Sequence, residues 1–547
     1  MKIYSIRTLE ELKTYRKSWN DILESNQNDN PFIEFNWIEN WWKYLGEAGS
    51  VEVLVLYNED RIMGFFPLQF SKVFSTTIIE FVGRADASYM DFIVYEEDKE
   101  TAIYFVLDEL MKSFPNTMFH LHGVLSSSST CTIIKNYVAI RKYETSIFSA
   151  ITPFINVKAI NLDDYMNKRK KLNGLNRKER RLRYLGEVKT SQVKLEEMED
   201  VFAIHDKHWK NRTDTSHFSE EAYKNFYNAL LSNREGTLQT QLEGLYLDNQ
   251  LIAFSYGFLC RGRYIGIVSG HDSDYEIYGP GTILNKDLIA ASQKKGLRVF
   301  DLGVGYEPYK FEWNTGVDYV NEFIIASKEW QSQMIFHLYK TKGQVKEVLK
   351  KNYKIVQLKR KYVDQSIQFV KNASKKEWIQ TFRKLSNKIY SHQSIDIYQQ
   401  DQGTQELVNY DLLDYSDTKR RMYNLSNMHK RYYSGFLPYS DSRFSLFWVQ
   451  PEVIRVDELD YYEPLPKQSA FVVDWHMHKL PSICTFIRAK QDVQKIYLHT
   501  TKTDPHVTEH LQQLGFKHVN RVRKTCVLTL TKTQVIPPIS AKMKKSL

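Results

Sequence analysis

Short apolar runs separated by polar turns predict strands and hairpins in the first part of the chain. The run VEVLVLY at residues 51–57, an acidic turn at residues 58–60 and RIMGFFPLQF at residues 61–70 predict a β-hairpin. Because proline cannot donate to a strand ladder, we expect Pro67 to end the second strand or to lie at a sheet edge.

A longer alternating pattern follows in the middle of the chain. Three strand-like runs fill residues 237–272, with hairpin signals at residues 248–249 and 261–263. GPGTILNKDLIAASQKKG then predicts a helix, VFDLGVG a strand and EPYKFEW a short helix or turn. The order strand, strand, strand, helix, strand predicts an antiparallel meander followed by a crossover. The two strands that flank such a crossover helix can separate at their ends and open a slot.

Length and composition set the number of domains. The chain has 547 residues with 42% hydrophobic and 26% charged residues, so it can form roughly three to four folded domains at about 150 residues each. We predict an α/β (α+β) chain in five parts, which are residues 1–155, residues 156–335, a basic helical linker (336–390), a further α/β domain (391–535) and a basic tail (536–547).

Positive charge is concentrated in two segments. Lys and Arg exceed Asp and Glu by 75 − 65 = 10 in the whole chain, and residues 340–388 alone carry 15 basic and 3 acidic residues. This segment predicts a helical arm with a solvated basic face, or a peripheral contact with an anionic membrane. Nine basic residues between Lys168 and Arg183 predict an amphipathic helix pair interrupted near Gly174, with either a solvated face or a surface that holds an anionic ligand.

Cysteine and histidine spacing gives no metal or disulfide signal. The four cysteines form no CxxC pair, and the N-terminal sequence has no apolar segment of signal-peptide length, which together predict a cytoplasmic protein. His506, Glu509 and His510 spell HxxEH, but the pattern lacks a third ligand, and His476 with His478 has no further ligand either. We expect no metal.

The predicted slot carries the residues best suited to chemistry. A helix that begins at the glycines of GPGT exposes unpaired amides with a partial positive charge, so Gly279, Pro280, Gly281 and Thr282 can hold a phosphate group. Gly303 and Gly305 allow a ligand to approach the second strand. Asp301, Glu307 and Lys310 follow that strand, where a carboxylate can accept the proton of an attacking amine or hydroxyl while a lysine or tyrosine assists the leaving group. This arrangement predicts acyl transfer.

Residues 161–313 resemble a known family. The basic KRKKLNGLNRKERRLR, HDKHW with His205 and Trp209, the LDNQLIAFSYG hairpin, Tyr275 with GPGTIL, and FDLGVGYEPYKFEW are similar to the acetyltransferase domain of CelD/BcsL-like proteins, which are GNAT-fold acyltransferases. The resemblance implies acetyl-CoA or another acyl-CoA as donor, its pyrophosphate near residues 279–282, and Asp301, Glu307, Tyr309 and Lys310 as motif positions, with Glu307 the preferred base. It extends to the FemABX transferases, which carry two GNAT-like units in tandem. The resemblance therefore implies tandem GNAT-like units, each with a mixed, mostly antiparallel sheet, flanking helices and a splayed strand pair. Residues 156–335 would form the acyltransferase unit, and residues 1–155 and 391–535 would form degenerate units.

Three functional hypotheses follow. The first is an acyl-CoA dependent N- or O-acyltransferase that acts on a sugar, a glycan precursor or a cell-envelope intermediate, with nucleic acid an unlikely partner. The second is a FemABX-like transferase that takes its acyl group from charged tRNA, for which the basic helices would contact phosphates. The third is a noncatalytic scaffold of envelope polysaccharide synthesis.

Overall fold

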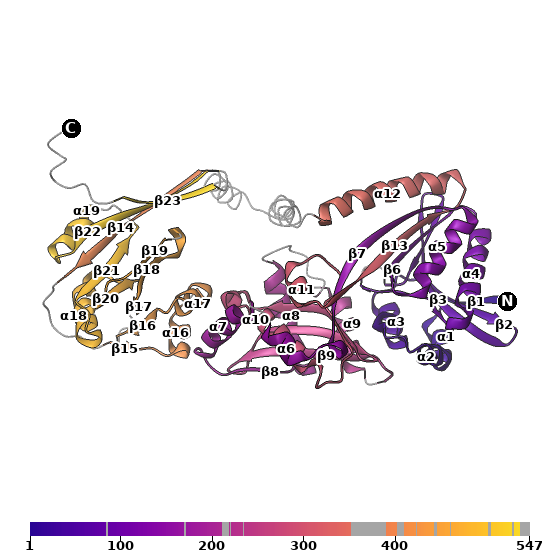
Figure 1. The fold of residues 1–547 in the computed structure, drawn as a ribbon, viewed down its shortest axis with the longest axis horizontal. Helices are drawn as coiled ribbons and strands as arrows, with labels where there is room; N and C mark the ends of the chain where they lie inside the picture. The colour runs from indigo at the N-terminus through magenta and orange to yellow at the C-terminus, as the bar shows by residue number, and fades with distance from the viewer. Residues whose placement is uncertain are drawn as a thin grey trace. The chain divides into compact units, whose positions relative to one another are not determined.

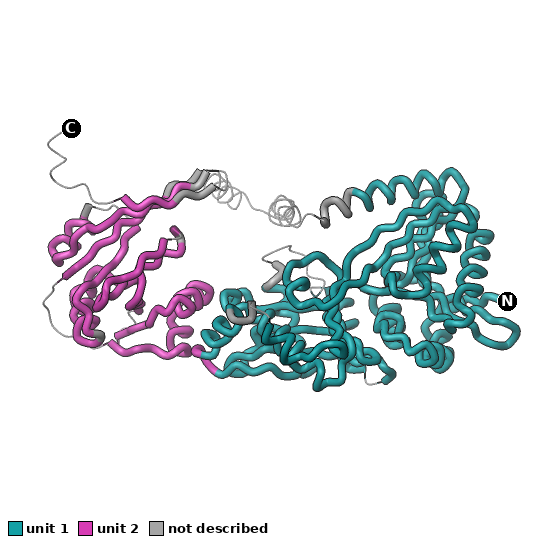
Figure 2. The backbone as a smooth tube through the Cα atoms, viewed as in Figure 1, with its two compact units in different colours: residues 1–183, 187–367 teal, residues 184–186, 368–547 magenta. Residues whose placement is uncertain are grey.

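The computed structural model forms two compact units (Figure 2). It describes residues 1–83, 86–168, 171–210, 218, 220–233, 235–351, 390–401, 410–422, 424–441, 446–459, 461–501, 505–527 and 530–536. One unit comprises residues 1–183 and 187–367, and the other comprises residues 184–186 and 368–547. Most of the predicted basic linker (352–389) and of the basic tail (537–547) lies outside the described residues.

The first half of unit 1 alternates helices and strands (Figure 1). Its elements are β1 Lys2–Ile6, α1 Leu9–Thr14, α2 Arg16–Ser25, η1 Pro31–Ile33, α3 Phe35–Tyr44, β2 Val51–Asn58, β3 Arg61–Val73, β4 Thr76–Phe81, β5 Ile93–Val94, η2 Glu96–Asp98, α4 Lys99–Ser113, β6 Thr117–Leu125, α5 Ser129–Arg141 and β7 Glu144–Asn156.

The second half of unit 1 repeats this order. Its elements are η3 Val157–Ala159, α6 Leu162–Asn167, α7 Lys171–Arg183, β8 Val188–Gln192, η4 Leu195–Glu197, α8 Met198–Lys210, α9 Glu221–Ser232, β9 Gln239–Leu247, β10 Gln250–Cys260, β11 Arg263–His271, η6 Ser273–Tyr278, α10 Pro280–Ser292, β12 Val299–Asp301, α11 Pro308–Trp313, β13 Gly316–Ala326 and α12 Trp330–Lys351.

The thirteen strands among the described residues of unit 1 join in one sheet. The order is β1-β2-β3-β4-β6-β13-β7-β12-β11-β10-β9-β8, with β5 beside β3. The last strand, β13, inserts between β6 and β7, and β7 also pairs with β12. The two predicted N-terminal domains therefore share one sheet, and the expected boundary at residues 155/156 falls at the end of β7. Two pairs are parallel, β4 with β6 across α4 and β11 with β12 across α10.

Unit 2 also combines helices with strands, in an order similar to that of one half of unit 1. Its elements are β14 Tyr390–Gln400, β15 Asp411–Leu412, α16 Tyr415–Arg421, α17 Leu425–Tyr433, β16 Leu437–Ser440, β17 Leu446–Gln450, β18 Val453–Val456, η8 Asp457–Leu459, β19 Tyr461–Pro464, β20 Ser469–Val473, η9 Met477–Lys479, α18 Leu480–Gln491, β21 Lys495–Thr500, α19 Pro505–Gln513, β22 Lys517–Val527 and β23 Leu530–Ile536.

The topology of unit 2 matches that of the second half of unit 1. The eight-stranded order is β15-β16-β17-β20-β21-β14-β22-β23, and the parallel pair β20/β21 is connected through α18. β14 lies between β21 and β22, as β7 lies between β12 and β13. The predicted fold class, an α/β chain of tandem units with mixed, mostly antiparallel sheets and flanking helices, is confirmed. Within the described residues, every helix is too short or too polar to cross a bilayer.

Two local predictions were wrong. β3 continues through Pro67 as an interior strand, because β4 pairs with β3 only from Leu68 onward and the Pro67 carbonyl accepts from Val82 instead. Gly174 lies inside α7, and the buried Leu175 and Leu182 that follow it anchor the helix. The break between α6 and α7 comes earlier, before Lys171.

Candidate functional site

The parallel strands β11 and β12 are paired only at one end. Their register covers three residue pairs, Arg263 with Val299, Tyr264 with Phe300 and Ile265 with Asp301. Beyond these pairs β11 continues to His271, whereas β12 has ended. A register shift between β10 and β11, at Tyr256 and Gly257, bends β11 where the separation begins. The predicted separation of the strands is therefore present, although the strand predicted over residues 299–305 ends at Asp301.

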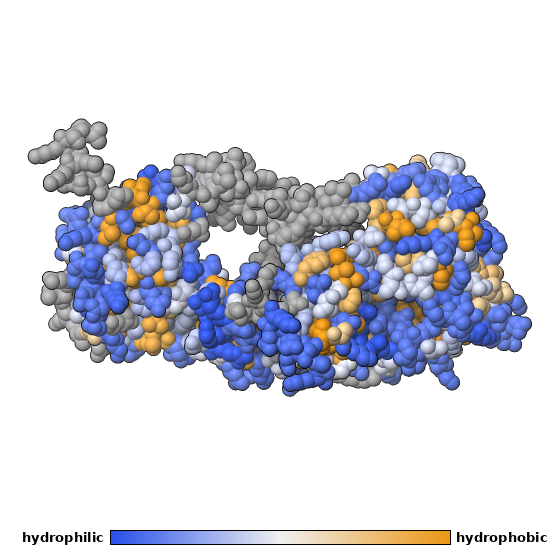
Figure 3. Space-filling model, viewed as in Figure 1, coloured by the Kyte–Doolittle hydropathy of each residue, from blue (hydrophilic) through white to orange (hydrophobic). Residues whose placement is uncertain are grey.

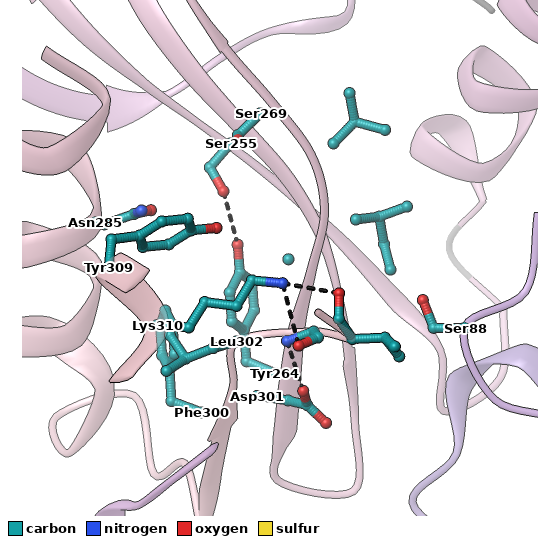
Figure 4. Close-up of a pocket in the computed structure, with 15 residues that line it drawn as sticks. Ser88, Ser255, Tyr264, Ser269, Asn285, Phe300, Asp301, Leu302, Tyr309 and Lys310 are labelled. Carbon is teal, nitrogen blue, oxygen red and sulfur yellow. Dashed lines mark hydrogen bonds between the residues drawn. The ribbon is translucent and has the colours of Figure 1, made fainter. Parts of the chain in front are cut away.

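A pocket of about 200 Å³ occupies the gap between the two strands (Figure 4). β10, β11, α10, β12 and α11 surround it, and one serine from the first half of unit 1 completes the wall. The lining residues are Ser88, Ser255, Tyr264, Gly266, Ile267, Val268, Ser269, Asn285, Phe300, Asp301, Leu302, Gly303, Val304, Tyr309 and Lys310.

Asp301 closes the paired end of the pocket and is only 2% exposed. Its carboxylate accepts hydrogen bonds from the Gly303 amide (2.8 Å), the Arg263 guanidinium (2.9 Å) and the Tyr89 hydroxyl (3.0 Å to each oxygen). Burial raises the pKa of Asp301, and the Arg263 charge and these donors act in the opposite direction. The carboxylate thus orients the loop that follows β12, and Tyr89 brings in the first half of the unit.

Lys310 holds the same loop from α11. Its ammonium group donates to the carbonyl oxygens of Gly303 (3.2 Å) and Val304 (2.9 Å) and lies 3.1 Å from the Glu307 carboxylate. Only 6% of Lys310 is exposed, so its charge lies in the pocket wall rather than in solvent. Glu307 caps α11 without lining the pocket, and a Cβ placed at Gly305 would lie 2.2 Å from its carboxylate. Glycine at 305 therefore leaves room for the Glu307 side chain.

Tyr309 extends from α11 into the pocket (Figure 4). Although 43% of Tyr309 is exposed, partial desolvation in the pocket and the nearby Glu307 charge raise the pKa of Tyr309 to about 12. The phenol therefore remains protonated at neutral pH and can act as a proton donor.

The start of α10 lies at the opposite end of β11. Gly279 caps the helix with φ +65° and Pro280 occupies its first position. A Cβ placed at Gly279 would lie 3.8 Å from the Lys178 ammonium nitrogen, and a Cβ at Gly281 would lie 3.7 Å from Nδ1 of His271. The basic helix α7 therefore lies beside the glycine-rich helix start, so Lys178 adds a positive charge to the amides there.

Salt bridges hold α7 in this position. Glu179 pairs with Lys286 of α10 and with Arg183 (2.8 Å). Although burial opposes the change, these two cations lower the pKa of Glu179. The surface around α7 is strongly hydrophilic in Figure 3.

The structure brings together part of the predicted site. Asp301, Gly303, Tyr309 and Lys310 line the pocket, whereas Gly279, Pro280, Gly281, Thr282, Gly305 and Glu307 do not. The sequence analysis missed the polar side chains that the other elements supply. A polar residue inside an otherwise apolar strand, as at Ser255 in LIAFSYGF, was an available signal, but no local pattern marks Ser88 or Tyr89.

The sequence of this region matches a known domain. Residues 169–311 match the family described as "Acetyltransferase (GNAT) domain". The chain thus contains an acyltransferase domain of the GNAT type. The predicted enzyme class is confirmed, whereas the narrower CelD/BcsL-like group stays a prediction. No curated protein matches the sequence.

Several solved structures match about 60% of this chain at low sequence identity. FemX has 12% identity and a TM-score of 0.43 over 62% of this chain and 100% of its own. The C-terminal domain of a putative lysylphosphatidylglycerol synthetase from Agrobacterium fabrum has 12% identity and a TM-score of 0.39 over 60% and 95%. A tandem GNAT protein from the clavulanic acid biosynthesis pathway has 8% identity and a TM-score of 0.38 over 60% and 100%.

Proposed function

We propose that the second half of unit 1 transfers an acyl group from acyl-CoA to an amine or hydroxyl of a sugar, a glycan precursor or a cell-envelope intermediate. The separation of β11 from β12 around a pocket carries this proposal. The acyl thioester lies in the pocket, and the diphosphate lies on the amides at Gly281 and Thr282 beside Lys178.

The distance between these two places suits one extended donor. Tyr264 and His271 are seven residues apart on β11, which is about 23 Å at 3.3 Å per residue. The diphosphate and the acyl group of an acyl-CoA lie at opposite ends of its pantetheine arm. Donor binding along β11 therefore places the phosphates at the start of α10 and the thioester between the strands.

The reaction joins the acceptor to the acyl carbon. The acceptor nitrogen or oxygen attacks the thioester carbonyl, the new C–N or C–O bond forms, and the C–S bond breaks. Because Glu307 does not line the pocket, it takes the proton of the acceptor through a water, and Tyr309 gives a proton to the departing thiolate. The Lys310 charge stabilises the negative charge that develops on the substrate.

Calorimetry with acetyl-CoA tests the donor site. Gly281→Val is expected to abolish binding, because the nearest protein atom to the new Cβ is 3.7 Å away and the side chain projects into the proposed phosphate site. Glu307→Gln is expected to keep binding but to lose turnover by about 100-fold or more. Glu100→Val is the matched control, since Glu100 is an exposed residue in the first turn of α4, the crossover helix of the other half. Unchanged donor affinity in Gly281→Val would refute the phosphate site.

One observation favours aminoacyl-tRNA as the donor instead. Arg177 and Arg180 of α7 are exposed near the same helix start, where they could contact further phosphates. Binding of charged tRNA that weakens steeply with salt, together with no binding of acetyl-CoA, would favour this second candidate.

A further inference from the structure

Two buried hydroxyl groups lie together in the wall of the pocket, away from Asp301 (Figure 4). Ser255 of β10 is 4% exposed and Tyr264 of β11 is 2% exposed, and their oxygen atoms are 3.2 Å apart. Both residues line the pocket (Figure 4). The Tyr264 ring is fixed against Phe300 with the ring centroids 4.8 Å apart. The pair is therefore a built, polar floor under an otherwise partly apolar gap.

The hydrogen-bonding capacity of this pair exceeds what the protein uses. Two hydroxyls offer two hydrogens and four lone pairs, and their mutual bond consumes one hydrogen and one lone pair. Among the described residues, the structure gives neither hydroxyl a second hydrogen-bond partner. Burial also raises the pKa of Tyr264 to about 12, so its hydroxyl keeps its proton at neutral pH. The floor can thus donate to and accept from a group that enters the pocket.

The position of the floor indicates which part of the donor reaches it. The start of α10 lies beside His271, and the two strands meet at Ile265. Ser255 is paired with Ser269 of β11, and its hydroxyl oxygen lies near Gly266, so the two hydroxyls lie between these two ends. A donor that extends from α10 toward the paired end of the strands therefore brings its acyl end to Ser255 and Tyr264. A short acyl chain fits in a pocket of about 200 Å³.

We propose that Ser255 and Tyr264 select a short acyl group that carries a hydroxyl, such as a 3-hydroxybutanoyl group, over the alkyl chain of the same length. This inference rests on the proposed acyl-CoA function. An alkyl chain that displaces water from the floor leaves the hydroxyl pair without a partner, whereas a hydroxyacyl chain replaces the lost hydrogen bonds.

Calorimetry with butanoyl-CoA and 3-hydroxybutanoyl-CoA tests the inference, with acetyl-CoA as the reference donor. The unmodified protein is expected to bind the hydroxyacyl donor at least about tenfold more tightly than butanoyl-CoA, which is the lower end of what one unpaired buried hydroxyl costs. In the double variant Ser255→Ala/Tyr264→Phe the ratio is expected to fall to about one, and the affinity for acetyl-CoA, measured in parallel, separates this loss of preference from a general loss of donor binding.

Controls separate this inference from loss of fold and from the proposed function. Ser292→Ala removes a buried hydroxyl of α10 that donates to the Ile289 carbonyl outside the pocket, and it is expected to keep the tenfold ratio. Thermal unfolding of each variant identifies a misfolded protein; if the double variant is misfolded, Ser255→Ala alone is expected to reduce the ratio at least threefold. Acetyl-CoA binding with no preference between the two four-carbon donors overturns the inference alone, whereas no binding of any acyl-CoA overturns the proposed function as well.

Discussion

The two halves of unit 1 share one topology, but their parallel strand pairs have opposite properties. In the second half, β11 and β12 separate around a pocket after Asp301. In the first half, β4 and β6 pair from Thr77 to Glu80, and the chain at Met90 then donates to the Gly123 carbonyl of β6 (2.9 Å). Phe92 packs beside it against Phe81. The same sheet therefore contains one open strand pair and one that is filled by its own chain.

The crossover helices α4 and α10 also differ, in the charges that surround their N-terminal ends. α4 begins after the acidic Glu96, Glu97 and Asp98, so its positive end is neutralised by its own carboxylates. α10 begins at Gly279 with no acidic residue in its first turn and with Lys178 beside it. Only the second arrangement suits an anionic donor. The two halves thus keep the same strand order, although only the second half has a helix start that suits an anion.

The filled half also supports the open half. The segment that covers β4 and β6 continues into the neighbouring pocket, because Ser88 lines it and Tyr89 donates to Asp301. The first half is therefore both a sealed copy and part of the wall of the active copy.

The largest expected effect comes from reopening the filled pair. Phe92→Ala removes a ring that is 2% exposed and has its centroid 4.8 Å from those of Phe66 and Phe81. We expect a loss of about 3–5 kcal/mol in the free energy of unfolding, measured in urea. Phe74→Ala is the matched control, since Phe74 is 84% exposed, and it should change stability by less than about 0.5 kcal/mol. A small loss for Phe92→Ala would mean that this segment does not seal the first half.

An intermediate effect is expected where the two halves meet. Tyr89→Phe removes one donor from the buried Asp301 carboxylate, which should cost about 1–3 kcal/mol of stability. Because Asp301 orients the loop at Gly303, turnover with acyl-CoA should also fall, by about tenfold or more.

Tyr137→Phe provides the matched comparison. Tyr137 is a fully buried tyrosine whose hydroxyl donates to the Asp108 carboxylate (3.0 Å) within the first half. Its loss should lower stability to a similar degree but leave turnover per folded molecule unchanged. Equal turnover in the Tyr89→Phe and Tyr137→Phe variants would contradict a role of the first half in positioning Asp301.

Local patterns in the sequence predict the local parts of this comparison. The meander, α10 and the strand that ends at Asp301 follow from apolar spacing and from glycine and proline positions, which act over a few residues. Tyr89 contacts Asp301 across 212 positions, and β13 inserts between strands that precede it by more than 150 residues. Such contacts depend on global packing, so no periodicity in either segment reveals them. Pro67 is the opposite case. Its local sequence predicts the end of a strand or a sheet edge, but it lies within β3 because β4 pairs with β3 only from Leu68 onward.

The smallest expected effect concerns how α7 is held at the open half. Since Lys286 and Arg183 lower the pKa of Glu179 in the folded protein, its ionised form stabilises the fold. This stabilisation is present above the unfolded pKa of about 4.5 and is lost as the pH falls through the lower folded value. Glu179→Gln should therefore cost about 1 kcal/mol at pH 7, and the difference from the unmodified protein should shrink as the pH is lowered below 4.5.

The matched control for this effect is Glu10→Gln, because the side chain of Glu10 is 85% exposed in its pair with Lys13 and should contribute nothing measurable. Urea unfolding between pH 3 and pH 7 distinguishes the two variants. If the Glu179→Gln difference is instead constant with pH, the variant acts by changing packing between α7 and α10. The charge of Glu179 would then have no part in holding Lys178 beside Gly279, and the asymmetry between the two crossover helices would depend on helix packing alone.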